Sequence, residues 1–305
     1  MKYIITVDVG GTNLKAALLD ENCVIRMKRI ISTRSLRGSC GVIEAVAESV
    51  KTVMADSGLR RSSIIGAGIG LPGPVDHKTG LVHFLPNIPG IHRVNLKRIL
   101  SRKLGLSVCV DNDAKLMCLA EHHLGAARGI DFAVCLTLGT GVGGGLILNG
   151  SLFRGALNAA GEVGHIPLNE KGPRCNCGGR GCLEAYVGNS RILRDARKVY
   201  GRRITLEELS ALARKRDRRA VLIWQGVGER LGIALTGLVN VLNLDAVIIG
   251  GGVAKAGSVL FEPLRRTLRA RAMSVQGKHV RVLRAKLGYD AGLIGAAILV
   301  KNSNQ

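Results

Sequence analysis

The sequence predicts an α/β protein with two lobes. Its 305 residues are 47% hydrophobic, which is enough to bury one large core or two ordinary ones. Predicted strands alternate with predicted helices in the first half of the chain, as is typical of an α/β lobe. A pattern of strand, glycine turn and strand occurs at residues 3–19 and again at 132–148. We therefore expect two related lobes that face each other and arose by internal duplication.

The first lobe is expected to begin with a hairpin. Residues 3–9 and 14–19 predict two strands, joined by the turn Gly10-Gly11-Thr12-Asn13. Apolar residues at helical spacing predict helices over 42–55, 96–104 and 114–124, and the last two end at Gly105 and Gly125. Short apolar runs over 64–69 and 107–110 predict two further strands.

The second lobe repeats this beginning. Residues 132–138 and 144–148 predict strands, and the glycines between 139 and 150 argue against a membrane-spanning helix in this uncharged stretch. A buried strand is predicted over 246–249 and a helix over 291–300. We expect one lobe to comprise residues 1–115, joined by the C-terminal helix at about 291–305, and the other to comprise 116–290.

The charge balance is strongly basic. Lysine and arginine number 44 against 22 aspartates and glutamates, giving a net charge of +22, which favours anionic partners such as phosphate-bearing substrates. Aromatic residues make up only 3% and interleave with no basic run, so a nucleic-acid partner is not expected. The densest basic stretch, over 191–219, is interpreted as a solvated helix surface. The N-terminus lacks the pattern of a signal peptide, so we expect a cytoplasmic protein with no membrane partner.

The most specific motif lies between Glu162 and Glu184. One histidine and three cysteines with the spacing H-x9-C-x-C-x4-C suit a tetrahedral structural Zn²⁺ site with no open position. Free thiols or an accidental redox pair are the alternative. Folding of this loop around zinc would bring Glu162 and Glu184 together, where they could bind a polyhydroxylated ligand. The four predicted zinc ligands are His165, Cys175, Cys177 and Cys182.

Three glycine turns follow apolar strands. Backbone without side chains lets N–H groups approach phosphate oxygens closely, so three such turns predict a nucleotide site, although each one alone is usually a tight turn. A dinucleotide-binding motif does not fit, because a strand follows the G-x-G-x-x-G match that begins at Gly139, and no P-loop motif occurs. The turns are Gly10-Gly11-Thr12, Gly139-Thr140-Gly141 and Gly250-Gly251-Gly252.

Acidic residues stand beside two of the predicted strands. Asp8 ends the first strand and suits a Mg²⁺ ion held through water near the phosphates, or else it caps the strand end. Asp111-Asn112-Asp113 separates a strand from a helix, and an ordinary N-cap accounts for one of the three. A carboxylate there could accept the proton of a hydroxyl nucleophile while the asparagine orients the same ligand.

Together these motifs resemble the ROK family of repressors, open reading frames and kinases, within the actin-like and hexokinase-like ATPase superfamily. The run from Asp8 to Lys15 resembles the first phosphate motif, residues 110–114 the catalytic-base segment, and residues 139–144 the second phosphate motif. Residues 161–165 resemble the sugar-binding E-x-G-H motif. The run 175–184 matches the signature C-x-C-G-x-x-G-C-x-E without a gap. The resemblance covers nearly the whole chain and implies a two-lobed actin-like, ribonuclease H-like fold with a zinc-bound loop.

The resemblance also implies roles for individual residues. Asp113 would be the general base on a sugar hydroxyl, and His165 would both ligate zinc and contact the sugar. Gly251 and Gly252 would approach the nucleoside of ATP. The other sugar hydroxyls would be bound by Asn87, Asn112, Glu162, His165 and Glu184. The phosphates of ATP, with Mg²⁺, would be held by Asp8, Gly10, Gly11, Thr12, Lys15, Gly139, Thr140 and Gly141.

The expected function is that of an ATP-dependent hexokinase of the glucokinase type, which phosphorylates the 6-hydroxyl of a hexose. Asp8 stands so near the first residue that no helix-turn-helix domain, found in some family repressors, precedes it, which favours a kinase. Glucose is favoured because residues 179–186 resemble glucokinases, and family members are commonly homodimers. Departures from the family pattern at Ile91-His92 and Asn158 leave N-acetylmannosamine, fructose, mannose or allose open, and Lys115, where relatives often have a neutral residue, is expected to add charge near the site. The alternative from another class is a non-enzymatic sugar sensor that binds DNA or a protein partner through its basic surface.

Overall fold

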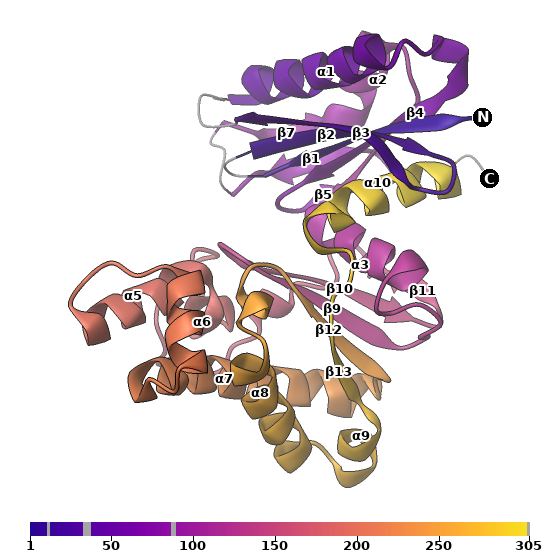
Figure 1. The fold of residues 1–305 in the computed structure, drawn as a ribbon. Coiled ribbons are helices and arrows are strands. Elements are labelled where there is room, and N and C mark those ends of the chain that lie inside the picture. The colour runs from indigo at the N-terminus through magenta and orange to yellow at the C-terminus, as the bar shows by residue number, and fades with distance from the viewer. Residues whose placement is uncertain (11–12, 33–37, 87–89, 304–305) are drawn as a thin grey trace. The chain divides into compact units, whose positions relative to one another are not determined.

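The computed structural model describes residues 1–10, 13–32, 38–86 and 90–303, and the chain divides into two compact units (Figure 1). Unit 1 comprises residues 1–121, 154–160 and 289–305. Unit 2 comprises residues 122–153 and 161–288. The chain therefore passes from unit 2 into unit 1 and back again for the short segment 154–160.

Unit 1 is built on a five-stranded sheet with the strand order β3-β2-β1-β4-β8. β1 and β2 form the predicted antiparallel hairpin, whereas β4 and β8 run parallel to β1. Helices α1 and α2 cover one face of the sheet and α10 covers the other (Figure 1). A second, three-stranded sheet has the order β5-β6-β7. The elements are β1 (Tyr3–Val9), β2 (Asn13–Asp20), β3 (Ile25–Ser32), α1 (Gly38–Ser57), β4 (Ile64–Leu71), β5 (Val75–Asp76), β6 (Leu81–Phe84), β7 (His92–Asn95), α2 (Leu96–Leu104), β8 (Val108–Asn112), α3 (Asp113–Leu124) and α10 (Ala291–Ser303), with a 3₁₀ turn η1 (Arg61–Ser63).

Unit 2 contains a five-stranded sheet with the order β11-β10-β9-β12-β13. Its core is formed by the apolar residues of β9 and β12 together with α5 to α8, among them the fully buried Trp224 of α7. The elements are β9 (Ala133–Leu138), β10 (Val142–Leu148), β11 (Ser151–Phe153), α4 (Glu184–Val187), α5 (Asn189–Tyr200), α6 (Leu206–Arg214), α7 (Arg218–Leu242), β12 (Ala246–Gly250), α8 (Ser258–Arg271), α9 (Ser274–His279) and β13 (Arg281–Arg284), with 3₁₀ turns η2 (Val163–His165), η3 (Val253–Ala256) and η4 (Gly288–Asp290) at the unit boundary.

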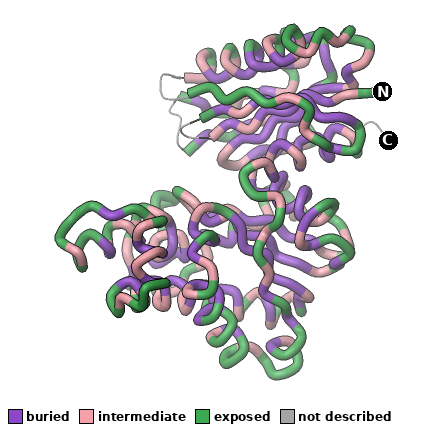
Figure 2. The backbone as a smooth tube through the Cα atoms, in the orientation of Figure 1, coloured by how far each residue is buried: buried purple, intermediate pink, exposed green. Residues whose placement is uncertain are grey.

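The two five-stranded sheets have the same topology, in line with the repeated pattern of strand, glycine turn and strand in the sequence. In each, a central strand pairs antiparallel with the second strand of a hairpin, β1 with β2 and β9 with β10. The same central strand pairs parallel on its other side, β1 with β4 and β9 with β12. Figure 2 shows that these central strands are buried along most of their length.

Strand β3 was not predicted from the sequence. This strand lies at the edge of its sheet, where β2 is its one pairing partner among the described residues, and most of its side chains are exposed, with Ile30 63% exposed. An edge strand is held by backbone hydrogen bonds and does not need the alternation of apolar and polar residues that reveals a half-buried strand. By contrast, the predicted helix at 96–104 matches α2 at both ends, where Asn95 caps the first turn and Gly105 adopts the left-handed conformation.

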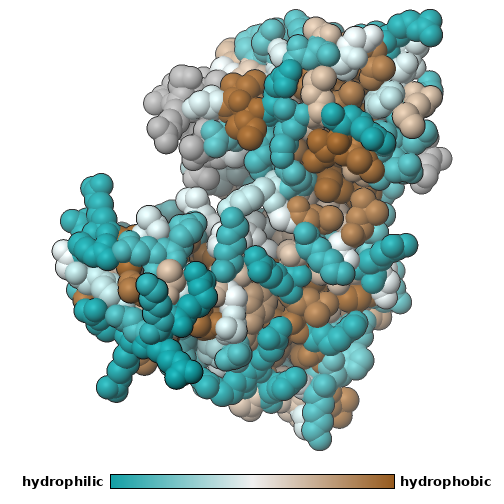
Figure 3. Space-filling view, in the orientation of Figure 1, coloured by the Kyte–Doolittle hydropathy of each residue, from teal (hydrophilic) through white to brown (hydrophobic). Residues whose placement is uncertain are grey.

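The predicted solvated basic surface is confirmed. Ten of the eleven basic side chains between 191 and 219 are exposed and Arg191 is half-buried. Hydrophilic side chains cover much of the face of unit 2 that Figure 3 shows. No helix in the described part of the chain combines the length and apolar character required to span a lipid bilayer.

The backbone of helix α10 closely approaches the backbones of β4 and α3. A Cβ atom placed on Gly295 would lie 1.9 Å from the carbonyl oxygen of Leu116 in α3, and one on Gly68 of β4 would lie 2.3 Å from the carbonyl oxygen of Ala296. Glycine at these positions therefore lets α10 approach both the sheet and α3.

We expect Gly295→Ala to lower the free energy of unfolding by about 1–3 kcal/mol or more, because the added methyl group forces α10 away from α3. Gly237→Ala is the matched control, since a Cβ there would meet nothing within 4 Å. Gly237 lies inside α7, so this change is expected to stabilise by about 0.4–1 kcal/mol. Denaturant unfolding of both variants checks the prediction, and equal effects would contradict it.

Candidate functional site

The two acidic motifs of unit 1 lie at the same edge of its sheet. Parallel pairing places Asp8 of β1 opposite Gly70 of β4, and Gly70 opposite Asp111 of β8. The chain leaves β1 into the first glycine turn and leaves β8 into α3. The predicted phosphate turn and the predicted base segment are therefore brought together, as expected for loops that follow the carboxyl ends of parallel strands.

Asp8 is largely buried and carries its own counter-ion. Its side chain is 17% exposed, and Lys15 Nζ lies 3.1 Å from Asp8 Oδ2 while also donating to the carbonyl oxygen of Tyr289 at 2.9 Å. The N–H of Gly10 donates to the carbonyl oxygen of Asn13 at 2.9 Å and closes the turn. The predicted site residues Gly11, Thr12 and Asn87 lie outside the described residues.

The side chains of the segment Asp111-Asn112-Asp113 make different contacts. The Oδ1 atom of Asn112 accepts from the backbone N–H groups of Ala114 and Lys115 at 3.0 and 3.1 Å, so Asn112 caps α3. Its Nδ2 atom donates to the carbonyl oxygen of Gly73 at 3.0 Å. Asp113 is the first residue of α3 and is half-buried, with its carboxylate at the positive end of the helix dipole.

Asp111 is fully buried and forms an ion pair that the sequence analysis did not predict. Its Oδ2 atom lies 2.6 Å from Nη1 of Arg154, and its Oδ1 atom accepts from the N–H of Asn112 at 2.8 Å. Arg154 follows Asp111 by more than forty residues and belongs to no periodic pattern, so no local signal in the sequence connects them. A buried carboxylate requires such a partner, and this requirement was the only available hint.

In unit 2, the second and third glycine turns also share a sheet edge. β9 and β12 are parallel, with Thr137 opposite Gly250, so both turns follow strands that end side by side. The N–H of Gly139 donates to the carbonyl oxygen of Gly141 at 2.9 Å. Gly251 has a φ of +85° and a Cβ there would lie 2.2 Å from the carbonyl oxygen of Leu138, so only glycine fits.

Two buried polar atoms at this edge lack a hydrogen-bond partner among the described residues. They are Oγ1 of Thr137, just before the second turn, and Oδ1 of Asn189, whose own N–H donates to the carbonyl oxygen of Gly139 at 2.9 Å. Buried polar groups are normally paired, so unpaired ones beside a glycine turn are suited to a polar ligand.

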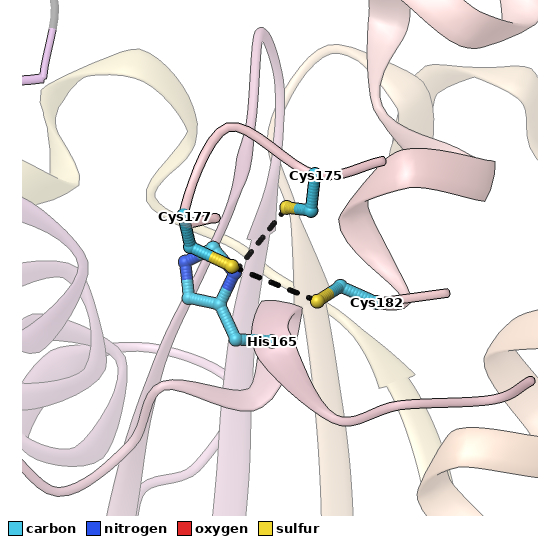
Figure 4. Close-up of side chains that lie close together, drawn as sticks. All are labelled: His165, Cys175, Cys177 and Cys182. Atoms are coloured by element: carbon cyan, nitrogen blue, oxygen red, sulfur yellow. Dashed lines mark hydrogen bonds between the residues drawn. The ribbon is translucent and has the colours of Figure 1, made fainter. Parts of the chain in front are cut away.

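The four predicted zinc ligands form one cluster, which confirms their expected proximity (Figure 4). Their donor atoms all lie within 4.8 Å of one another. Around a tetrahedral zinc ion with Zn–S bonds of about 2.3 Å, neighbouring sulfurs are about 3.7 Å apart. The Sγ atoms of Cys177 and Cys182 are separated by 3.7 Å, and Cys175 Sγ lies 3.7 Å from Nδ1 of His165. The donor set and its spacing therefore fit zinc.

The protonation of these thiols depends on their surroundings. Burial raises the pKa of the Cys175 thiol to about 12, whereas the backbone N–H of Gly179 lowers the pKa of the Cys177 thiol. A metal ion that binds here must therefore displace a proton from Cys175.

Three of the five residues expected to bind sugar, Glu162, His165 and Glu184, lie at the cluster. Nε2 of His165 lies 4.0 Å from Oε2 of Glu162, and Oε1 of Glu184 lies 3.6 Å from the sulfur of Cys175. The other oxygen of Glu184 accepts from the N–H of Val142 at 2.9 Å, directly after the second glycine turn. A Cβ on Gly141 would lie 2.5 Å from that oxygen, so the glycine makes room for Glu184. Glu184 thus joins the cysteine loop to the turn.

Comparison with known proteins identifies relatives across almost the entire chain. The model of the ROK family matches residues 4–303. A protein named glucokinase from Thermotoga maritima is 36% identical, and the alignment covers 98% of this chain and 97% of that protein. A xylose repressor from Bacillus subtilis is 28% identical over 98% of this chain and 77% of its own length.

Solved structures also match almost the entire chain. The ROK family glucokinase from Streptomyces griseus, in complex with glucose and AMPPNP, is 32% identical and superposes with a TM-score of 0.86 over 98% of this chain and 99% of that one. A ROK hexokinase from Thermus thermophilus is 34% identical with a TM-score of 0.81, and 99% of this chain and 100% of that one are covered. The predicted actin-like α/β fold is confirmed.

Proposed function

Because the chain belongs to the ROK family, we propose that it is an ATP-dependent hexokinase that transfers the γ-phosphoryl group of ATP to the 6-hydroxyl of a hexose, preferentially glucose. One observation carries this proposal. Asp113 begins α3 at the sheet edge where the first glycine turn also begins, so the proposed base and the proposed phosphate-binding turn share one edge of unit 1. The glucokinase from Streptomyces griseus, whose structure contains glucose and an ATP analogue, supports the choice of substrates.

The chemistry requires one proton acceptor and several hydrogen-bond donors. In the proposed reaction the 6-hydroxyl oxygen forms a bond to the γ-phosphorus as the bond to the bridging oxygen of ADP breaks, and Asp113 accepts the hydroxyl proton. Backbone N–H groups of the turns at 8–15 and 139–141 bind phosphate oxygens, and Gly251-Gly252 lies against the nucleoside. Thr137 and Asn189 offer the unpaired polar atoms described above to the nucleotide.

The proposed sugar ligands are Asn87, Asn112, Glu162, His165 and Glu184. Three of them already stand together around the cysteine cluster. Asn112 has a second amide proton besides the one it donates to Gly73, and this proton is the one available to a sugar oxygen.

Two metal ions belong to the proposal. Zinc, bound by His165 and the three cysteines, would order the loop that carries Glu184 and would leave no coordination position open. Magnesium would neutralise charge on the ATP phosphates, and the carboxylate of Asp8 is the hard oxygen ligand suited to hold it through water. A homodimer stays a prediction from the family resemblance, and a cytoplasmic location stays a prediction from the sequence.

A coupled assay that follows ADP release with a panel of hexoses tests the proposed function. We expect the highest kcat/KM with glucose, and a penalty of about 5- to 160-fold for sugars that leave one buried polar group unpaired. A highest kcat/KM with N-acetylmannosamine would contradict the choice of glucose. Absence of turnover with every sugar, together with salt-sensitive binding to duplex DNA, would favour a non-enzymatic regulator.

We expect Asp113→Asn to lower kcat by ~10²–10⁴, because an amide cannot accept the hydroxyl proton. The measurement is steady-state turnover with glucose and ATP. Calorimetric titration is the control: sugar and nucleotide affinity should change by less than about threefold, since the substitution preserves shape. A folded variant that turns over at nearly the normal rate would exclude Asp113 as the base.

Native mass spectrometry is expected to detect about one zinc ion per chain. Cys177→Ser should reduce the bound zinc and lower the midpoint of thermal unfolding, because the loop loses a ligand. Cys40→Ser is the matched control, since Cys40 is an exposed thiol of α1 outside the cluster. A folded protein that carries no metal would show that the four-ligand interpretation is wrong.

A further inference from the structure

Residues 154–160, here called the 154–160 loop, belong to unit 1 although both neighbouring elements, β11 and η2, belong to unit 2. The N–H of Ala160 donates to the carbonyl oxygen of Arg154 at 3.0 Å, so the loop is closed at its base. Glu162, a proposed sugar ligand, follows two residues after the loop ends. Through the chain, the loop therefore connects Glu162 to the unit that carries Asp113.

Three polar interactions attach the loop to unit 1. Arg154 pairs with the buried carboxylate of Asp111 at its base. Farther along the loop, Nζ of Lys115 donates to the carbonyl oxygen of Asn158 at 2.5 Å, and Nδ2 of Asn158 donates to Oδ1 of Asp76 at 2.9 Å. Asn158 has a φ of +57°, a left-handed conformation that asparagine tolerates better than most residues.

The position of Lys115 is unfavourable for its positive charge. Lys115 is 2% exposed and lies in the first turn of α3, where the helix dipole disfavours a cation. A buried ammonium group is tolerated only where its protons find acceptors, and the carbonyl oxygen of Asn158 is one of these.

We propose that Lys115 is a positioning residue that fixes the 154–160 loop beside Asp111-Asn112-Asp113 and thereby sets the affinity for the hexose. This inference rests on the proposed function. Lys115 acts on a backbone carbonyl group of the loop and takes no part in the transfer itself. Its loss should therefore weaken hexose binding much more than it slows the chemical step, and should leave ATP binding unchanged.

The kinetic test compares Lys115→Met with two other variants. Methionine matches the length of lysine without donating a hydrogen bond, so we expect the KM for glucose to rise about 10- to 100-fold, with kcat and the KM for ATP changing by less than about threefold. Lys115→Arg keeps a charged donor and should recover most of the affinity. Lys301→Met is the matched control: it removes a bond of 2.6 Å from Lys301 Nζ to the carbonyl oxygen of Glu21 in the same unit and should change neither KM.

Hydrogen exchange of the protein without substrates provides a readout independent of activity. Lys115→Met should speed exchange of the loop amides, including the N–H of Ala160, whereas Lys301→Met should not. If the wild type phosphorylates no hexose, the proposed function fails, and faster loop exchange in Lys115→Met would still support the fixing of the loop. Unchanged loop exchange, or an active Lys115→Met enzyme with an unchanged KM for glucose, would overturn the inference.

Asn158→Gly is the second variant that tests the inference if Lys115→Met does not fold. Glycine accepts the left-handed φ and keeps the carbonyl oxygen that Lys115 contacts, so only the bond to Asp76 is lost. We expect a smaller rise in the KM for glucose, about 3- to 10-fold, and faster exchange of the loop amides. Asp76→Ala removes the same bond from its other end, together with the bonds that Asp76 accepts from Lys78 and Thr79, so it should show both effects at least as strongly. Wild-type values in both variants would overturn the inference.

Discussion

The hydrogen bonds between the parallel strands β1, β4 and β8 hold Asp8, Gly70 and Asp111 in one row across the sheet of unit 1. A shift of register by one residue would turn each of these side chains to the opposite face. The positions of Gly10, Asn112 and Asp113 depend on that row, because the first glycine turn and the start of α3 continue from it. The parallel pairing of β9 with β12 does the same for the glycine turns of unit 2.

Burial of charge is the second constraint on unit 1. Asp111 and Lys115 lie almost wholly out of solvent on either side of Asn112 and Asp113, and each binds a residue of the 154–160 loop. An unpaired charge in such a place is far more costly than a paired one. The polar contacts that satisfy these charges therefore also hold the loop, so its position is coupled to the segment that contains the proposed base.

In unit 2, polar side chains are likewise clustered, in the set formed by His165 and the three cysteines. Its cysteine loop has little apolar content, and the four donor atoms lie within 4.8 Å of one another, an arrangement that fits a structural zinc ion. Glu184 extends this order to the second glycine turn through its bond to the N–H of Val142. A structural cluster and a proposed ligand-binding turn are thus linked by one carboxylate.

The sequence by itself determined the features that are local or periodic. The hairpin of β1 and β2, helix α2 with its caps, the repeated strand and turn pattern, and the zinc-ligand spacing could all be predicted because short-range geometry and residue type specify them. Only the tertiary structure decided the rest. It paired Asp111 with Arg154 and Lys115 with Asn158 across some forty residues of chain, and it added β3 as an edge strand without a burial pattern. Such contacts arise when buried charges and open backbone groups find partners during folding, and the partner is chosen by topology, which no local pattern in the chain records.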